Sequence, residues 1–184
     1  MTRAAQIGWG SIEETAICRE AYRHATAMRQ ETNVRVADLI KPGGVIADLR
    51  VADKARALRE LAHRAAPIVN IPEAAVHDAL TAREALGSTG VGAGVAIPHA
   101  RIAGLSGLCG FFARLPRPID FAAIDGRPVD LMFLLVVPES AGSEHLAALA
   151  CVSRALRSPA TAKALRETIG PAALYDILTD TSIG

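Results

Sequence analysis

The apolar run LMFLLVV at residues 131–137 constrains the fold more than any other segment of this chain. It lies between Pro128 and Pro138 and is far too short to cross a bilayer as a helix, which takes about 20 apolar residues. We therefore predict a β-strand here. Because the run has no polar side, both faces of its sheet must be covered.

Helical and strand patterns alternate around this run. Asp53 is placed to cap a helix, Pro72 fits the first turn of another, and Gly87 follows that helix's end. We predict strands at 45–50, 94–100, 107–116 and 128–138, and helices at 53–66, 71–86, 142–156, 159–168 and 171–178. This order predicts an α/β fold with a mixed parallel/antiparallel sheet covered by helices on both faces.

Residues 1–33 look separate from the main body at 34–184. The pattern SIEE at 11–14 is typical of a capping box, so a helix could run to about Gln30. Its apolar face is thin, which favours a mobile extension. The given sequence could also start too early, with Met28 as the true initiator. A docking helix is the alternative.

Composition and charge exclude several function classes. Hydrophobic residues make up 51% of the chain and aromatics only 4%, so the core is expected to consist of Ala, Leu, Val and Ile. A net charge of +1 without a basic run argues against nucleic-acid binding. Glu13, Glu14 and Arg19 interrupt any signal peptide, so we expect a soluble cytoplasmic protein without membrane insertion.

The three cysteines, Cys18, Cys109 and Cys151, are widely spaced and form no CxxC pair. We expect neither a disulfide framework nor a thiolate metal site. No cofactor-binding motif emerges from the sequence either.

The stretch STGVGAGVAIPHA at 88–100 carries three alternate glycines before Pro98 and His99. It is not a P-loop, because no lysine lies between Lys54 and Lys163. It does not match GxGxxG in either register, because the third glycine would fall on Val95 in one and on Ile97 in the other. The glycines are better explained by positive φ angles and close backbone approach. Since Pro98 lacks an N–H, we predict that a strand stops there and leaves His99 at the rim of the sheet.

The segment REALGSTGVGAGVAIPHA at 83–100 resembles the active-site stretch of phosphotransferase-system IIA proteins of the fructose/mannitol type (EIIA type 2), closest to the nitrogen-regulatory branch. The similarity extends over about residues 35–181. It implies the PTS IIA type-2 fold, a mixed sheet between helices. Ala93 stands where the branch often has Asn, and Ala100 where Gly is usual.

The resemblance also implies three site residues. His99 matches the phosphohistidine nucleophile, with Nε2 as the phosphorylated atom, His145 the second histidine, and Arg83 a supporting arginine. Neutral imidazole is a suitable acceptor near pH 7. His145 lies in the first turn of a predicted helix, on the face of Leu149, Val152 and Leu156, so it points inward and is expected to donate to the phosphoryl group. Arg83 would contribute a charge-assisted bond. His24, His63 and His77 are expected to have no role, and Ser88 and Thr89 at most a local one.

The primary hypothesis is a phosphoryl relay. An HPr-like phosphocarrier of the nitrogen (NPr) type would donate to His99, and regulatory targets such as kinases or transporters would sense the phosphorylation state. A single domain without a sugar-specific or membrane part favours regulation over sugar uptake by a fructose/mannitol IIA component. A non-catalytic interaction module stays open because of Ala93 and Ala100. A metal-dependent hydrolase using His99 and His145 lacks a third ligand.

Overall fold

The computed structural model describes residues 34–180, and every statement below concerns that part of the chain. Its helices are α2 (Val36–Leu39), α3 (Lys54–Val69), α4 (Glu73–Ala85), α5 (Glu144–Arg157), α6 (Pro159–Glu167) and α7 (Pro171–Thr179). Its strands are β1 (Ile40–Ile46), β2 (Gly90–Gly92), β3 (Val95–Ala96), β4 (His99–Ile102), β5 (Cys109–Ile119) and β6 (Val129–Pro138). The predicted helix and extension at residues 1–33 lie outside this range.

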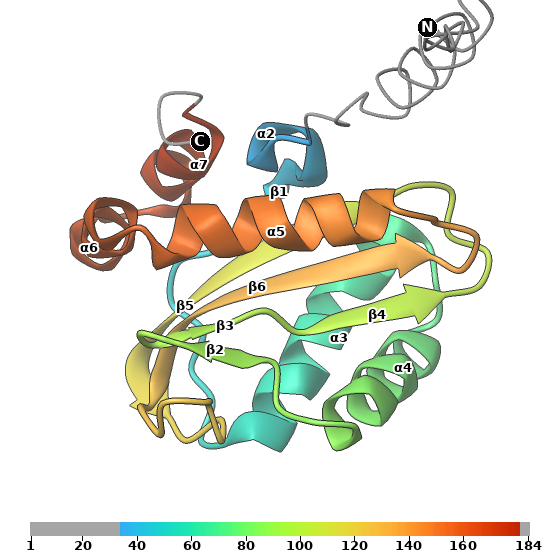
Figure 1. Ribbon diagram of the computed structural model, residues 1–184, viewed down its shortest axis with the longest axis horizontal. Helices are drawn as coiled ribbons and strands as arrows, with labels where there is room; N and C mark the ends of the chain where they lie inside the picture. The colour runs from blue at the N-terminus through green and yellow to red at the C-terminus, as the bar shows by residue number, and fades with distance from the viewer. Residues whose placement is uncertain (1–33, 181–184) are drawn as a thin grey trace, which may run out of the picture. The chain divides into compact units, whose positions relative to one another are not determined.

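The described strands form one mixed sheet in the order β1-β5-β6-β3-β2 (Figure 1). The long strands β5 and β6 run antiparallel at its centre, and β1 runs parallel to β5. Two short strands, β3 and β4, follow each other along the other side of β6, both parallel to it. The central strand β6 contains the apolar run, as predicted.

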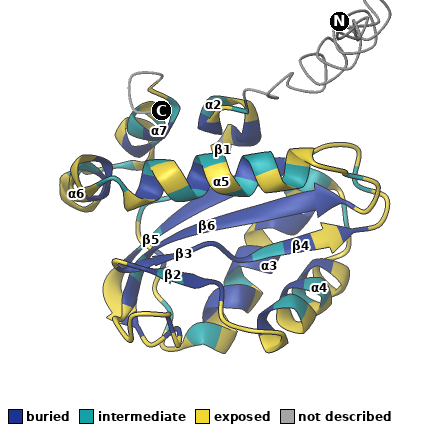
Figure 2. Ribbon diagram, viewed as in Figure 1, coloured by how far each residue is buried: buried dark blue, intermediate teal, exposed yellow. Residues whose placement is uncertain are grey.

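Helices cover both faces of the sheet, which confirms the predicted architecture. Alternate residues of β6 point to opposite faces: Met132 and Leu134 pack in the cluster that includes α3 and α4, whereas Phe133 and Leu135 pack in the cluster that includes α5, α6 and α7. The strand is buried along nearly its whole length (Figure 2). Full burial of such a side chain stabilises the fold by about 1.5–3 kcal/mol.

The helices from α3 to α7 begin within two residues of the predicted positions, whereas the short helix α2 was not predicted. The Asp53 carboxylate accepts a hydrogen bond from the Arg56 N–H at 2.8 Å, which caps α3. The helix continues through Pro67 and ends at Asn70, whose φ of 56° is left-handed. No described helix combines the length and apolar character needed to span a membrane.

The first strand differs from the prediction. β1 covers Ile40–Ile46 rather than residues 45–50, so only Val45 and Ile46 were placed correctly. Its register with β5 shifts between Ile40 and Val45. Lys41 to Gly44 contains Pro42 and two glycines, and such a bulged edge strand has no clean two-residue periodicity to recognise.

Candidate functional site

The glycine-rich segment lies between α4 and β4, and its glycines are required by geometry. A Cβ atom on Gly90 would lie 2.7 Å from the Cα atom of Ala123, too close for any side chain. Gly94 has a φ of +80°, and a Cβ there would lie 2.6 Å from Nη2 of Arg166. The segment leads into short strands and not into a helix. Close backbone approach and positive φ therefore explain the glycines, as predicted.

Ala93, which departs from the related pattern, is held in the left-handed region at a φ of 56°. Its N–H donates to Asp125 Oδ2 at 2.8 Å, and its carbonyl accepts from Arg166 Nη2 at 2.9 Å. Arg166 in turn donates to both carboxylate oxygens of Asp130, each at 2.7 Å. Two anchors thus keep the turn in place without an asparagine side chain.

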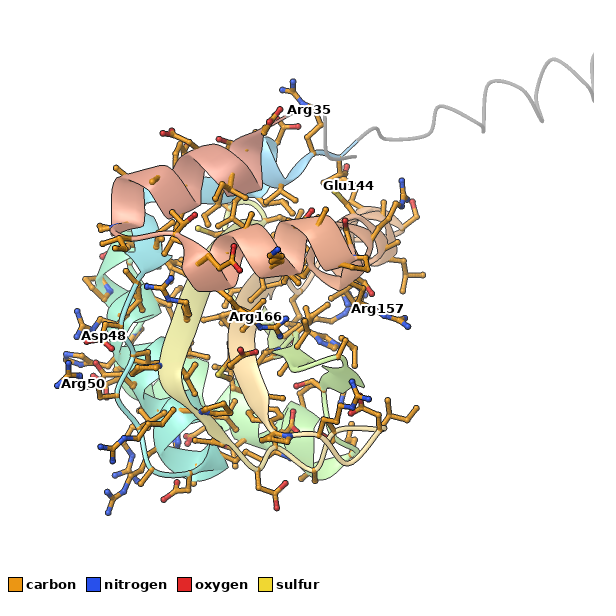
Figure 3. All side chains as sticks on the ribbon, turned by 90° about the vertical axis from the view of Figure 1, so that its left-hand side faces the viewer. Arg35, Asp48, Arg50, Glu144, Arg157 and Arg166 are labelled. Carbon is orange, nitrogen blue, oxygen red and sulfur yellow. The ribbon has the colours of Figure 1, made fainter. Side chains whose placement is uncertain are left out.

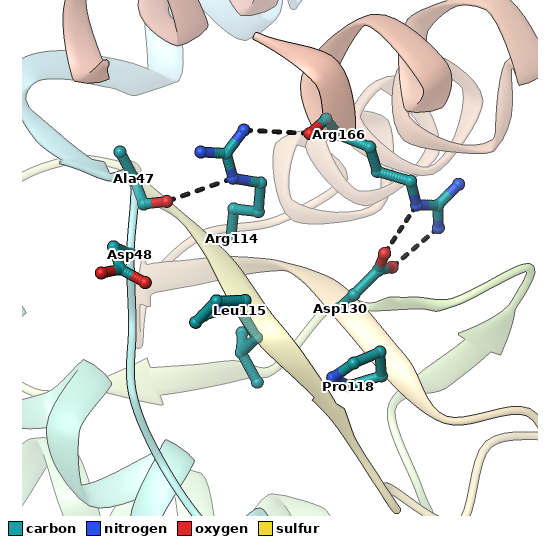
Figure 4. A pocket seen from close by; sticks show the side chains of 8 residues that line it. Ala47, Asp48, Arg114, Leu115, Pro118, Asp130 and Arg166 are labelled. Atoms are coloured by element: carbon teal, nitrogen blue, oxygen red, sulfur yellow. Dashed lines mark hydrogen bonds and ion pairs between the residues drawn. The ribbon is translucent and has the colours of Figure 1, made fainter. Parts of the chain in front are cut away.

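Arg166 and Asp130 also line a cavity of about 380 Å³ between β5 and α6 (Figure 4). The guanidinium of Arg114 lies on the same side, where it donates to the carbonyl of Ala47 at 3.1 Å. Figure 3 shows this side of the molecule with Arg166 labelled. The cavity therefore borders the anchor of the glycine segment.

A strand does end before Pro98, because β3 stops at Ala96, but the chain then rejoins the sheet and His99 is the first residue of β4. Pro98 lies in the gap between β3 and β4, so its missing N–H falls where no ladder bond is needed. Its carbonyl still accepts from the Leu135 N–H at 2.9 Å, which keeps the chain on β6. His99 is half-buried, and β4 pairs only with β6. The histidine therefore lies half-buried at the start of a strand that pairs on one side only in the described sheet, and not beyond the end of a strand.

The imidazole of His99 is bonded at both nitrogens. Nδ1 lies 2.9 Å from the carbonyl oxygen of Ile97, and Nε2 lies 3.0 Å from Nε of Arg83. A carbonyl can only accept and a guanidinium can only donate. These partners therefore assign the proton to Nδ1 and the lone pair to Nε2.

The second histidine lies at the start of α5, next to the first. The ring centroids of His99 and His145 are 5.8 Å apart, and His145 is partly buried. Arg101 Nη2 lies 3.5 Å from His145 Nδ1. Nη1 of the same arginine donates to the carbonyls of Glu139 and Ala141. Arg101 thus connects β4 to the start of α5, and its donation leaves the His145 proton on Nε2.

Both histidines stay neutral more readily than exposed ones. Burial lowers the pKa of His99 below its ordinary 6.5, and the charges of Arg83 and His145 lower it further, while the Ile97 carbonyl and Glu84 oppose this. Burial, then Arg101 and Arg83, likewise lower the pKa of His145. At neutral pH the Nε2 lone pair of His99 is therefore available.

The sequence reasoning did not single out Arg101, nor Glu84, which lies beside Arg83 and contacts Lys54 and Thr89. Arg101 follows His99 by two residues in a strand, so both lie on the same face. Glu84 falls four residues after the buried Leu80, so it is an acidic residue on the apolar stripe of α4. An acidic residue at such a position can be recognised from the sequence as one that needs buried partners.

The remaining candidates have ordinary explanations within the described residues. His63 contacts Glu73 at 2.7 Å, His77 lies 3.7 Å from Asp78, and His24 lies outside the described range. Cys109 and Cys151 are free thiols. Between residues 34 and 180, no group of three or more His, Cys, Asp or Glu side chains could hold a metal ion. The metal-dependent alternative therefore has no ligand set there.

Comparison with known proteins places the chain in a family. The chain is 48% identical over 143 residues to a "Nitrogen regulatory protein" of Bradyrhizobium diazoefficiens, covering 78% of this chain and 94% of that one. It is 37% identical to a protein of the same name from Pseudomonas aeruginosa, covering 82% and 99%.

Solved structures agree with the sequence relatives. The nitrogen regulatory protein IIA-Ntr of Neisseria meningitidis superposes with a TM-score of 0.74 at 35% identity, covering 78% of this chain and 99% of that one. IIA mannitol of Escherichia coli shares the fold, with a TM-score of 0.64 at 17% identity, covering 75% and 97%. Residues 38–181 match the family described as "Phosphoenolpyruvate-dependent sugar phosphotransferase system, EIIA 2". The chain therefore belongs to the EIIA 2 family of the phosphotransferase system.

Proposed function

We propose that the protein is a phosphoryl carrier that accepts a phosphoryl group on Nε2 of His99. One observation carries this proposal: the Nδ1 proton is held by the Ile97 carbonyl, so the Nε2 lone pair faces the Arg83 guanidinium. A nucleophile needs an unprotonated lone pair in a defined direction, and the incoming anion, which displaces this hydrogen bond, needs a cation at that point.

The transfer is a displacement at phosphorus between two histidines. The Nε2 lone pair of His99 forms the new N–P bond while the donor's N–P bond breaks and returns its electron pair to the donor ring. The His99 ring becomes cationic, and the Ile97 carbonyl stabilises its Nδ1–H. Arg83 stops donating to the imidazole lone pair and donates to the phosphoryl oxygens instead. His145 can donate from Nε2–H to the same oxygens, since Arg101 occupies its Nδ1.

We further propose that the protein acts in regulation and not in sugar uptake. The relatives named for nitrogen regulation match over most of both chains, whereas a fructose-specific EIIA component of Haloferax volcanii matches only 56% of this chain, at 38% identity. The donor would be an HPr-like phosphocarrier of the nitrogen type. Transfer of a phosphoryl group to the neutral His99 ring adds about one net negative charge and three acceptor oxygens to a half-buried site, which is a signal that a regulatory target can sense.

The decisive experiment is phosphorylation by the carrier relay with labelled phosphoenolpyruvate, followed by mass mapping. We expect acid-labile phosphate on His99 in the wild type and none in His99→Ala. A folded wild-type protein that takes up no label would identify a non-catalytic interaction module instead. Efficient onward transfer to a sugar-specific IIB domain would contradict the regulatory assignment.

A further inference from the structure

A buried acidic residue, Glu84, lies directly beside Arg83 in the last turn of α4. Its side chain is only 6% exposed. The Thr89 N–H lies 3.1 Å from both carboxylate oxygens, and the Thr89 hydroxyl donates to Oε2 at 2.6 Å. Nζ of Lys54, from the first turn of α3, lies 2.5 Å from Oε1. Burying a carboxylate is costly unless all its acceptor sites are used, so this is a built site.

The donors of Glu84 connect it to the nucleophile through the backbone. The carbonyl of Thr89 accepts from the Ile97 N–H at 2.9 Å, and the carbonyl of Ile97 accepts from Nδ1 of His99. Moving Thr89 therefore moves the carbonyl that fixes the tautomer of His99.

Glu84 also fixes the other side of the ring. Arg83, its neighbour in α4, donates from Nε to Nε2 of His99 and from Nη1 to the carbonyl of Gly87 at 3.0 Å. Anchoring Glu84 to Thr89 and Lys54 holds the last turn of α4 against the glycine-rich segment. Both hydrogen bonds of the His99 imidazole thus depend on the same carboxylate.

We propose that Glu84 is a positioning residue for His99, whose buried carboxylate, held by Thr89 and Lys54, orients the imidazole from both nitrogens. This inference rests on the phosphoryl-carrier function proposed above for its kinetic consequence, but the orientation itself is independent of that function. The negative charge of Glu84 acts in the same site, where it raises the pKa of His99 against the effect of burial.

The test compares Glu84→Gln with wild type. The glutamine amide has one acceptor oxygen in place of two and carries no charge. Its NH2 group must either face the Lys54 ammonium or turn the Thr89 hydroxyl from a donor into an acceptor, so the charge-assisted contacts of the carboxylate are lost. The first readout is ¹⁵N NMR of the His99 ring, which distinguishes Nδ1–H from Nε2–H. We expect a single Nδ1–H tautomer in the wild type and a mixture in Glu84→Gln, with a lower titration midpoint for His99.

The second readout is phosphoryl uptake from the phosphorylated HPr-like carrier. We expect the rate at saturating carrier to fall by about tenfold or more, with little change in the carrier concentration giving half the maximal rate. Glu73→Gln is the matched control, because it makes the same change at an exposed position of the same helix, and it should behave as wild type.

The outcomes separate the two proposals. A folded Glu84→Gln with the wild-type tautomer and wild-type saturating rate would overturn the positioning role. A wild-type protein that accepts no phosphoryl group would overturn the carrier function, while the tautomer would still decide the role of Glu84. If thermal unfolding shows that Glu84→Gln does not fold, Thr89→Val carries the test, since it removes only the hydroxyl donor and should shift the tautomer in the same direction.

Discussion

Replacing Arg83 by methionine tests the proposed chemistry most directly. The substitution keeps the aliphatic stem but removes the guanidinium that contacts His99 Nε2 at 3.0 Å. Two effects follow with opposite consequences. The lone pair loses a donor that must be displaced before attack, and the transferred phosphoryl group loses a cation.

The magnitudes decide which effect wins. A hydrogen bond to a charged group contributes about 1.5–3 kcal/mol, and each 1.36 kcal/mol changes a rate tenfold, so losing the phosphate contact should slow transfer by about 10- to 150-fold. Arg83 is partly exposed, and solvent screening places the expected loss near the lower limit, about tenfold. In the wild type, Arg83 gives up its hydrogen bond to the neutral imidazole but gains one to the phosphoryl group. Removing Arg83 therefore saves little on the first count and does not offset the loss of the phosphate contact.

The assay is single-turnover phosphoryl transfer from the phosphorylated carrier, combined with NMR titration of His99. The charge of Arg83 lowers the pKa of His99, so Arg83→Met should raise that pKa while slowing transfer. Arg83→Lys should recover only part of the rate, because one ammonium group cannot span both His99 and the Gly87 carbonyl as the guanidinium does. Arg64→Met, at an exposed ion pair on α3, is the control. An unchanged transfer rate, or a titration midpoint that moves down, would refute the reasoning.

Four further predictions concern pH and the glycine-rich segment. Because burial holds the pKa of His99 below 6.5, the initial rate of uptake should fall to half its plateau value at a pH below 6.5, and a midpoint above 6.5 would contradict this. Between the lowered pKa and 6.5 the unfolded chain binds more protons, so denaturant titrations should show lower stability as the pH falls through this window. Ala93→Asn should raise the free energy of unfolding by about 0.5–1 kcal/mol in the same measurement, because Asn tolerates the left-handed φ of 56° better than Ala; an unchanged midpoint would contradict this. Gly94→Ala should cost about 1–3 kcal/mol, since its Cβ would meet Arg166 at a φ of +80°, and wild-type stability would disprove that contact.

The sequence predicted those parts of the fold that depend on local pattern. The apolar run of β6 has no polar side, and that property alone requires helices on both faces. The edge strand β1 was misplaced because a bulge at Lys41 to Gly44 removes its periodicity. His99 was singled out as a candidate from a local pattern, the glycines and Pro98 around it, together with the family resemblance. Its position at the start of β4 was not predictable, because that strand exists only through pairing with β6.

The orientation of the His99 ring required long-range information that no spacing contains. Its Nε2 partner, Arg83, comes from 16 residues away, and the contact depends on how α4 ends against the glycine-rich segment. Glu84 was not predicted, but it could have been recognised, because a carboxylate on the buried stripe of a helix must have donors, and Thr89 and Lys54 are those donors. An acidic residue at an apolar position next to a candidate catalytic arginine thus indicates, from local sequence alone, a hydrogen-bond network with residues far away in the chain. The same reasoning accounts for Ala93: its two anchors, Asp125 and Arg166, hold the backbone that an asparagine would otherwise favour, so the substitution leaves the turn intact.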